Sequence, residues 1–416
     1  MPKSIQYNLL SFLAILMAFL FLLLLGQHYG IGVQTDNYFF SLMIVSYLSY
    51  FIRLAWDAMH AYYIKEKVTN LKSASQLYSV LLNNIIIISF LIISLYFLLT
   101  ENLIELSTHQ KNFLDIYIFY ILFHNILQFN KSILNLEKYF AFYYLVDIFI
   151  YILNILTVLI LLEDNIKVLA YSMIIGTSIA VLAQFYFIFY KISIKYSLQI
   201  KHKKTKQIYK NSIKIQFSSI LYDLKEPLLA MLFLSLGNGI YSLFNYANKF
   251  AAAIFHITTT PTINRFVTQV HYLVAQQKYL EVHKQIQITL MQTVPVFLII
   301  SLMFYLLMPS TMPLFFANTL SDNDLKYMQR LYLYMSLFYF LIAVEAPFTN
   351  TITAFKLFNY HIFINILFFI FLSLIYLLFQ LTSLLYYNYL FILIFAQFSN
   401  LVLYVHKNKI YLNNRT

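Results

Sequence analysis

Long apolar runs dominate the sequence, and each is about as long as a helix that crosses a bilayer. A transmembrane helix needs about 20 predominantly apolar residues. Windows of this length predict twelve spans, at about residues 9–26, 37–60, 77–99, 113–135, 140–162, 167–190, 213–236, 241–261, 287–308, 327–350, 359–379 and 385–405. Only 11% of the residues are charged, against about 25% in soluble domains. We therefore predict an all-α polytopic membrane protein, since β-barrel strands would alternate apolar with polar residues.

The distribution of basic residues predicts the topology. The segments expected on one face hold 21 Lys and Arg, those on the other face hold 4, and three lie inside spans. Cytoplasmic segments of membrane proteins are enriched in Lys and Arg. We therefore expect both termini in the cytoplasm. The net charge of +12 then reflects topology and contact with membrane lipids, and nucleic acid is not expected as a partner.

The longest connection divides the chain in two. We predict an N-terminal six-helix half (residues 1–190), a basic cytoplasmic linker (191–212), a C-terminal six-helix half (213–405) and a cytoplasmic tail (406–416). Gly30 and Gly32 precede the second span as Gly237 and Gly239 precede the eighth. Two such halves around a central cavity are a recurrent transporter plan. Apart from Pro2, every proline lies in the C-terminal half, which is therefore the expected site of bending.

The seventh predicted span contains three charged residues and a proline, namely Asp223, Lys225, Glu226 and Pro227. Charge near mid-bilayer costs at least ~2.5–3.5 kcal/mol, so such side chains usually face a cavity or a partner. In a regular helix Asp223 and Glu226 share a face, whereas Lys225 points elsewhere. We expect the two acids to line a transport cavity and to bind a coupling ion; the alternative is a structural charge cluster that bridges helices. Pro227 is an expected hinge, as are Gly237 and Gly239.

Lys249 lies inside the eighth span, which follows the short linker at Gly237–Gly239. It could meet Asp223 or Glu226 across this hairpin, either as a structural ion pair or as a ligand for phosphate, since a lysine serves as a point charge for such groups. Asn245 and Asn248 precede it on the same helix.

The second span carries Arg53, Asp57 and His60 at spacings of four and three, which would place them on one face of a helix. Arg53 could bind a diphosphate or simply extend to the interface and pair with Asp57. Asp36 begins this span, where helix capping explains an acid.

Other polar residues inside spans suggest packing roles. We expect Asp147 and Glu345 to be interfacial or pairing residues, and a polar stripe that includes His124 and Asn125 to hydrogen-bond between helices. The chain has no cysteine, and neither metalloenzyme spacing nor a phosphate-binding loop occurs. No cofactor is expected beyond a coupling H⁺ or Na⁺.

Two stretches resemble the MurJ (MviN) lipid II flippases of the multidrug/oligosaccharidyl-lipid/polysaccharide (MOP) exporter superfamily. Thr35-Asp-Asn-Tyr-Phe-Phe40 resembles the "TDAFF" start of the second helix of that family. Tyr241-Ser-Leu-Phe-Asn-Tyr-Ala-Asn-Lys-Phe250, continuing to Pro261-Thr-Ile-Asn-Arg265, resembles the "YYADR…LP.L" pattern of its eighth helix. Asp36 and Lys249 match positions that are polar or charged in the family.

The sequence also departs from that family. The acid–base pair of the eighth helix appears here as Asn248-Lys249, the arginine motif of the first helix is missing, and so are the thirteenth and fourteenth helices. The twelve-span O-antigen and capsule flippases of the Wzx type fit at least as well.

The resemblance implies a flippase of the bacterial inner membrane that carries a polyprenyl-diphosphate-linked glycan to the outer leaflet by alternating access. It also implies membrane enzymes of glycan assembly as candidate partners. In that role Arg53, Lys249, Asn245 and Asn248 would bind the head group, and Asp223, Glu226 and Asp57 would serve a coupling ion. Neither Lys225 nor Asp36 receives a role. The alternatives are a drug/cation antiporter of the same superfamily, a membrane-embedded glycan polymerase or acyltransferase, and a scaffold that binds lipid-linked sugar without transporting it.

Overall fold

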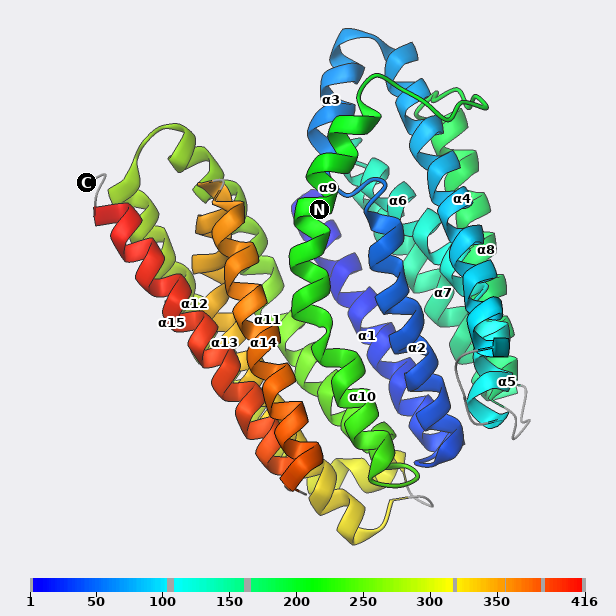
Figure 1. Cartoon of the computed structure of the whole chain (residues 1–416), viewed down its shortest axis with the longest axis vertical. Helices are drawn as coiled ribbons and strands as arrows, with labels where there is room; N and C mark the ends of the chain where they lie inside the picture. Colours follow the sequence, from blue (N-terminus) through cyan, green and yellow to red (C-terminus); the bar gives the residue numbers. More distant parts are fainter. Residues whose placement is uncertain are drawn as a thin grey trace. The chain divides into compact units, whose positions relative to one another are not determined.

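The computed structural model describes residues 3–102, 108–160, 166–316, 320–355, 357–382 and 386–413. These residues form α-helices joined by short connections, and none of the residues in these ranges lies in a β-strand (Figure 1). The predicted all-α fold is confirmed. Within the described residues, each of the twelve apolar windows falls on a helix or on a pair of helices separated by a break; residues 161, 162 and 385 of these windows lie outside the described residues.

The chain divides into two compact units, unit 1 (Met1–Ile220) and unit 2 (Leu221–Thr416). The division falls inside helix α9 (Thr205–Asp223). The predicted linker, residues 191–212, lies within unit 1. Helix α9 begins inside the linker, in unit 1, and ends in unit 2.

Unit 1 is built around long apolar helices that pack in pairs. Its helices are α1 (Lys3–Tyr29), α2 (Val33–Arg53), α3 (Met59–Thr69), α4 (Leu71–Asn102), α5 (Thr108–Tyr117), α6 (Tyr120–Leu136), α7 (Phe140–Ile160), α8 (Lys167–Tyr190) and most of α9. Helix α1 packs on α7, and α6 packs on α8 and α4. The predicted span 113–135 is broken at Ile118 and Phe119, where the Phe119 and Ile121 amides bond to the third preceding carbonyl instead of the fourth.

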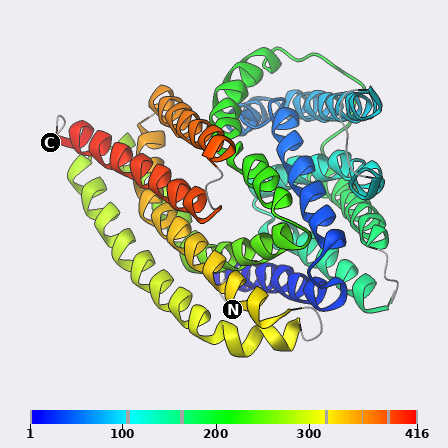
Figure 2. The ribbon, with the colours of Figure 1, turned by 60° about the horizontal axis from the view of Figure 1, so that its bottom comes forward.

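Unit 2 is organised around α13. Its helices are α10 (Lys225–Ser235), α11 (Ile240–Ala275), α12 (Tyr279–Phe315), α13 (Asp322–Ala354), α14 (Phe358–Thr382) and α15 (Tyr386–Asn413). Helix α13 contacts α11, α12, α14 and α15 (Figure 2). Pro295, Pro309 and Pro313 all lie inside α12 and do not end it.

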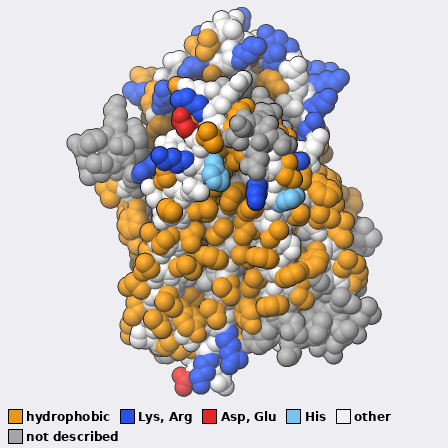
Figure 3. All heavy atoms as spheres, turned by 90° about the vertical axis from the view of Figure 1, so that its left-hand side faces the viewer, with side chains coloured by type: hydrophobic (Ala, Val, Ile, Leu, Met, Phe, Trp, Pro, Cys, Tyr) orange, Lys and Arg blue, Asp and Glu red, His pale blue; other side chains and the backbone are white. Residues whose placement is uncertain are grey.

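The helices have the length and surface of membrane spans. Among the described residues, seven helices are long and apolar enough to cross a membrane: parts or all of α1, α4, α7, α8, α12, α13 and α15. Helix α12 exposes Leu298, Leu302 and Leu306. The face of unit 2 in Figure 3 is a broad hydrophobic band with charged side chains toward its ends, as expected for a surface that contacts lipid.

An extended segment, residues 191–204, runs along the first turns of α4 in unit 1. Its backbone binds α4 side chains: the Ser197 amide donates to Ser79 Oγ (3.0 Å), and Asn83 Nδ2 donates to the Gln199 carbonyl (2.9 Å). The start of α9 is also anchored, because Ser212 Oγ accepts the Ala58 amide at 2.9 Å. The basic linker is therefore a fixed part of unit 1.

Candidate functional site

The charged stretch 223–227 lies at a break between two helices. Helix α9 ends at Asp223, α10 begins at Lys225, and Leu224 separates them. Pro227 is the third residue of α10, and in the first turn of a helix a missing N–H is tolerated. Inside a longer helix its ring would clash with the carbonyl of residue 223, which explains why α9 stops there.

The break brings Lys225 back to Asp223. Lys225 Nζ lies 2.7 Å from Asp223 Oδ1 and 4.0 Å from Glu226 Oε1. It also lies 3.9 Å from the centre of the Tyr222 ring. The expectation that Lys225 points away from Asp223 is therefore wrong, because it assumed a regular helix through both residues. The ammonium belongs to the most enclosed of the three charged side chains, which is 7% exposed against 23% for Asp223 and 40% for Glu226.

A hydrogen-bonded chain links this break to two other helices. Tyr222 donates to Gln397 Oε1 of α15 (3.0 Å), and Gln397 Nε2 donates to Glu345 Oε2 of α13 (2.7 Å). Thr349, one turn further along α13, donates to the other oxygen of Glu345 (3.3 Å). We call Tyr222, Asp223, Lys225, Glu226, Glu345 and Gln397 the unit 2 network.

Two members of this network, Glu345 and Gln397, were not predicted as site residues from the sequence. Glu345 was expected to pair or to lie at the interface, and the structure gives it hydrogen-bond donors from two helices. Gln397 received no role, although a glutamine inside the apolar window 385–405 is itself a signal. Its side chain is fully buried.

Helix α11 supplies the predicted head-group residues. Asn248 Oδ1 accepts a hydrogen bond from the Tyr339 hydroxyl of α13 at 3.1 Å. Asn245 is also buried but bonds within its own helix, to the Tyr241 carbonyl (2.9 Å). Lys249 is exposed and forms no ion pair with any described carboxylate within 4.0 Å. Glu226 is close enough to attract its charge.

Lys249 is part of an exposed polar stripe on α11. His256, two turns further on, is also exposed, and its Nδ1 lies 3.3 Å from Thr260 Oγ1. The two turns between Lys249 and His256 hold only the small side chains of Ala252 and Ala253 on this face. In the predicted eighth span, an exposed charge and an exposed imidazole are not compatible with a lipid-facing surface.

The hairpin before α11 requires its glycines. Gly237 has φ +133° and Gly239 has φ +84°, and both values are in the region that favours glycine. Gly239 is the residue that caps α11. The hairpin therefore sets how α10 leads into the helix that carries Lys249.

The predicted cluster in the second span does not share a helical face. Helix α2 ends at Arg53, residues 54–58 form turns, and α3 begins at Met59. Asp57 therefore lies in a turn, and no ion pair with Arg53 occurs among the described residues. The Arg53 guanidinium lies 5.4 Å from the centre of the Tyr50 ring, and its Nε is buried without a hydrogen-bond partner.

Asp36 lies in the first turn of α2 and is 4% exposed. The cap itself is made by Thr35, whose hydroxyl donates to the Gly32 carbonyl (3.0 Å) and accepts the Gly32 amide (3.1 Å). Asp36 can still complement the positive end of the helix dipole.

Unit 1 contains a second buried lysine, Lys131 of α6. The Lys131 side chain is 7% exposed and lies 2.5 Å from Asp147 Oδ2. It also lies 4.2 Å from the centre of the Tyr143 ring. Asp147 was expected to be a pairing or interfacial residue, and it does pair.

One acid outside the spans has a perturbed pKa. In α3, Glu66 accepts a hydrogen bond from Ser73 Oγ (2.5 Å) and lies 3.4 Å from Lys203 Nζ of the extended segment. The hydrogen bond from Ser73, together with Lys203, lowers the pKa of Glu66, and this outweighs the opposing effect of burial. Ser73 also contacts His202 Nε2 at 3.2 Å.

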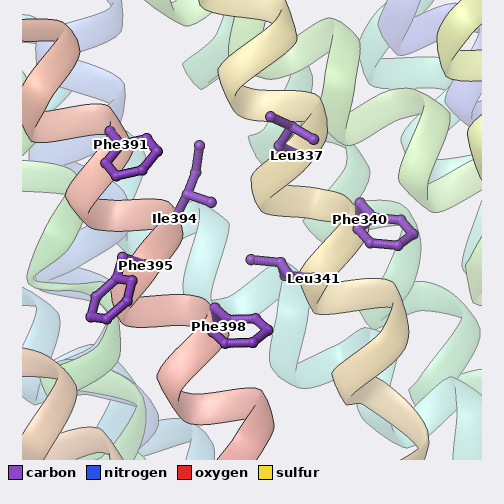
Figure 4. Close-up of a pocket in the computed structure, with 7 residues that line it drawn as sticks. All are labelled: Leu337, Phe340, Leu341, Phe391, Ile394, Phe395 and Phe398. Carbon is purple, nitrogen blue, oxygen red and sulfur yellow. The ribbon is translucent and has the colours of Figure 1, made fainter.

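A pocket of about 270 Å³ lies between α13 and α15 (Figure 4). Seven apolar residues line it: Leu337, Phe340, Leu341, Phe391, Ile394, Phe395 and Phe398. It offers no charged or hydrogen-bonding side chain, so it is not a site for a charged head group.

Comparison with known proteins identifies the fold. No protein-family model and no curated protein sequence matches the chain. Among solved structures, the lipid II flippase MurJ in an inward closed conformation is 14% identical, with a TM-score of 0.78, over 97% of this chain and 87% of that one. An inward-facing multidrug resistance MATE family transporter of the MOP superfamily is 10% identical, with a TM-score of 0.75, over 98% and 95% of the two chains.

A third similar structure is a MOP superfamily transporter from Pyrococcus furiosus, described as having a binding pocket of reverse polarity that suggests a different function. It is 12% identical, with a TM-score of 0.71, over 99% of this chain and 95% of that one. The likeness to these structures extends over nearly the whole chain and confirms the resemblance at the level of fold. This chain has the fold of the MOP superfamily transporters.

Proposed function

We propose that this protein is a transporter that flips a polyprenyl-diphosphate-linked oligosaccharide from the cytoplasmic to the outer leaflet by alternating access. The observation that carries the proposal is Lys249, a cation exposed on the helix of the predicted eighth span, without a carboxylate partner within 4.0 Å among the described residues. A lysine in that position must meet water or an anion, because exposing its charge to lipid is too costly.

Arg53 in unit 1 also supports an anionic cargo. Its Nε is buried without a partner, and no described carboxylate pairs with it. A guanidinium can bind phosphate oxygens through two parallel hydrogen bonds. We assign Lys249 to binding of the diphosphate within unit 2, with Asn245 and Asn248 as further ligands on α11, and Arg53 to anion binding within unit 1. No catalytic step is required of the protein.

The acids of unit 2 support coupling to a cation. Asp223 and Glu226 lie at the helix break, and Glu345 is hydrogen-bonded to Gln397 behind them. Carboxylates inside spans are characteristic of ion pathways and proton relays. We propose that H⁺ or Na⁺ binding at Asp223 and Glu226 drives the cycle. Asp57, which lies in a turn away from a common face with Arg53, is the weaker candidate for this role.

A drug/cation antiporter is the second candidate, and the three acids of the unit 2 network, Asp223, Glu226 and Glu345, favour it. An organic cation would bind to the acids directly and would be repelled by Lys249 and Arg53. The two functions therefore differ in the sign of the charge on the cargo.

Transport into liposomes distinguishes the two. Purified full-length protein is reconstituted with a fluorescent polyprenyl-diphosphate oligosaccharide, and the labelled sugar that becomes accessible to an external quencher is measured over time. In parallel, uptake of a fluorescent lipophilic cation is followed in the same liposomes. The proposal expects flipping of the anionic lipid and no cation uptake; the opposite result would establish the antiporter.

A further inference from the structure

Lys225 is the most enclosed charged group at the break between α9 and α10, and the proposed function gives it no task. A lysine is costly to keep inside a span. Its ammonium is held on three sides, by Asp223 at 2.7 Å, by Glu226 at 4.0 Å and by the Tyr222 ring at 3.9 Å. The carboxylates that hold it are the two assigned to the coupling ion.

The geometry places the ammonium where a bound cation would lie. A monovalent cation that binds the Asp223 carboxylate would lie beside the Lys225 ammonium, which is 2.7 Å from Asp223 Oδ1. Asp223, Glu226 and Lys225 together carry a net charge of −1, so one added cation neutralises the group. The full ammonium charge and a second full cation would repel each other at this separation.

Few other side chains around the helix break can balance the negative charge of Asp223 and Glu226. Glu345 and Tyr339 face the group from α13, and Tyr222 from α9. Lys249 of α11 interacts with Glu226. Gln397 of α15 is neutral and occupied by Tyr222 and Glu345. Lys225 is therefore a cation already in place beside Asp223.

We propose that Lys225 is a tethered counter-ion that competes with the coupling cation for Asp223 and Glu226. This inference rests on the cation coupling in the proposed function. With no ion bound, Lys225 pairs with Asp223 across the break and holds the end of α9 to the start of α10. When Na⁺ binds, or a proton neutralises Asp223, the ammonium is displaced and that link across the break is lost.

The test is cation binding to the purified full-length protein in lipid nanodiscs. Equilibrium binding of radioactive Na⁺ is measured for the wild type, Lys225→Gln and Lys225→Arg, and the carboxyl infrared band of Asp223 is followed against pH. Removing the competitor should tighten Na⁺ binding tenfold or more, or, if the cation is a proton, move the Asp223 titration up by at least one pH unit. Lys225→Arg should resemble the wild type, and Asp223→Asn/Lys225→Gln should abolish the response.

Lys131→Gln is the matched control, because Lys131 is a buried lysine paired with an aspartate in the other unit. It should change neither measurement. The proposal is overturned if monodisperse Lys225→Gln protein shows no change in Na⁺ affinity and none in the Asp223 titration. Size-exclusion chromatography shows whether Lys225→Gln is folded. If it is not, Na⁺ binding is compared between Lys225→Arg and Lys225→Met. Lys225→Arg keeps a cation that competes with Na⁺, so it should bind Na⁺ more weakly than Lys225→Met.

Failure of the proposed cargo is distinguishable from failure of this inference. Na⁺ binding and carboxyl titration need no glycan lipid. A protein that binds Na⁺ as expected but does not flip the oligosaccharide refutes the cargo alone.

Discussion

Gln397 of α15 donates a 2.7 Å hydrogen bond to Glu345 of α13 while its own carbonyl oxygen accepts from Tyr222 of α9. One fully buried amide thus joins three helices and connects the helix break to a carboxylate. Amides suit this position because they donate and accept at once. Lys225 contacts both Asp223 and the Tyr222 ring. Side chains in direct contact therefore connect Asp223, through Tyr222 and Gln397, to Glu345 of α13.

Replacing Gln397 by leucine should destabilise unit 2. The change removes the donor to Glu345 and the acceptor for Tyr222, and leaving buried polar groups unsatisfied costs about 1–3 kcal/mol each. Thermal unfolding of the purified protein measures the loss. Gln184→Leu is the control, since Gln184 is also fully buried but makes only a 3.5 Å bond to the Leu127 carbonyl. Equal stability of the two variants would refute a special role for Gln397.

Lys249→Ala should slow flipping of the diphosphate lipid at least tenfold. A hydrogen bond to a charged group contributes about 1.5–3 kcal/mol, and about 1.4 kcal/mol corresponds to a factor of ten. Lys249→Arg should retain part of the rate. The liposome assay measures it, with Lys326→Ala at the start of α13 as the control. An unchanged rate in Lys249→Ala would remove Lys249 from the head-group site.

The positions of the helices were predictable because apolar length alone decides which segments cross a membrane. The breaks inside the predicted spans were not predictable in this way. Residues 54–58 and Ile118–Phe119 lie inside apolar windows that contain no glycine or proline at those points. The turn at 54–58 is held by the contact of the Ala58 amide with Ser212, far along the chain, and no local pattern reports such a contact.

The sequence drew attention to the charged stretch 223–227 as a candidate site, but the geometry of that stretch was not predictable from it. Charge inside a span identified Asp223 and Glu226, and Pro227 was recognised as disruptive. The spacing of residues in a continuous helix predicts that Lys225 points away from Asp223. That prediction failed because the helix is broken at Leu224. A proline acts on the carbonyl four residues earlier, so an allowance for a break at residue 223 would have brought the two charges together.

The polar stripe on α11 can be mapped by cysteine labelling, because the natural sequence contains no cysteine. Single cysteines at Lys249 and His256 should react with a membrane-impermeant thiol reagent, since these side chains are exposed on a face too polar for lipid. Cysteines at the buried positions Ala247 and Ala251 should react at least tenfold more slowly. Equal labelling at all four positions would show that α11 does not present one face to water.

Glu66→Gln should lower stability at neutral pH but not in acid. The pKa of Glu66 is lowered from 4.5 in the folded protein, so its contribution is present above about pH 4.5 and is lost as the pH falls through the lower folded value. We expect a melting temperature about 2–4 °C below the wild type at about pH 7, and a difference that shrinks steadily below about pH 4. Glu281→Gln, at an exposed acid that pairs with Lys278 at 3.5 Å, is the control and should show little effect at either pH. A difference of constant size from neutral to acid pH would mean that Glu66 stabilises the α3–α4 turn by packing and not by its charge.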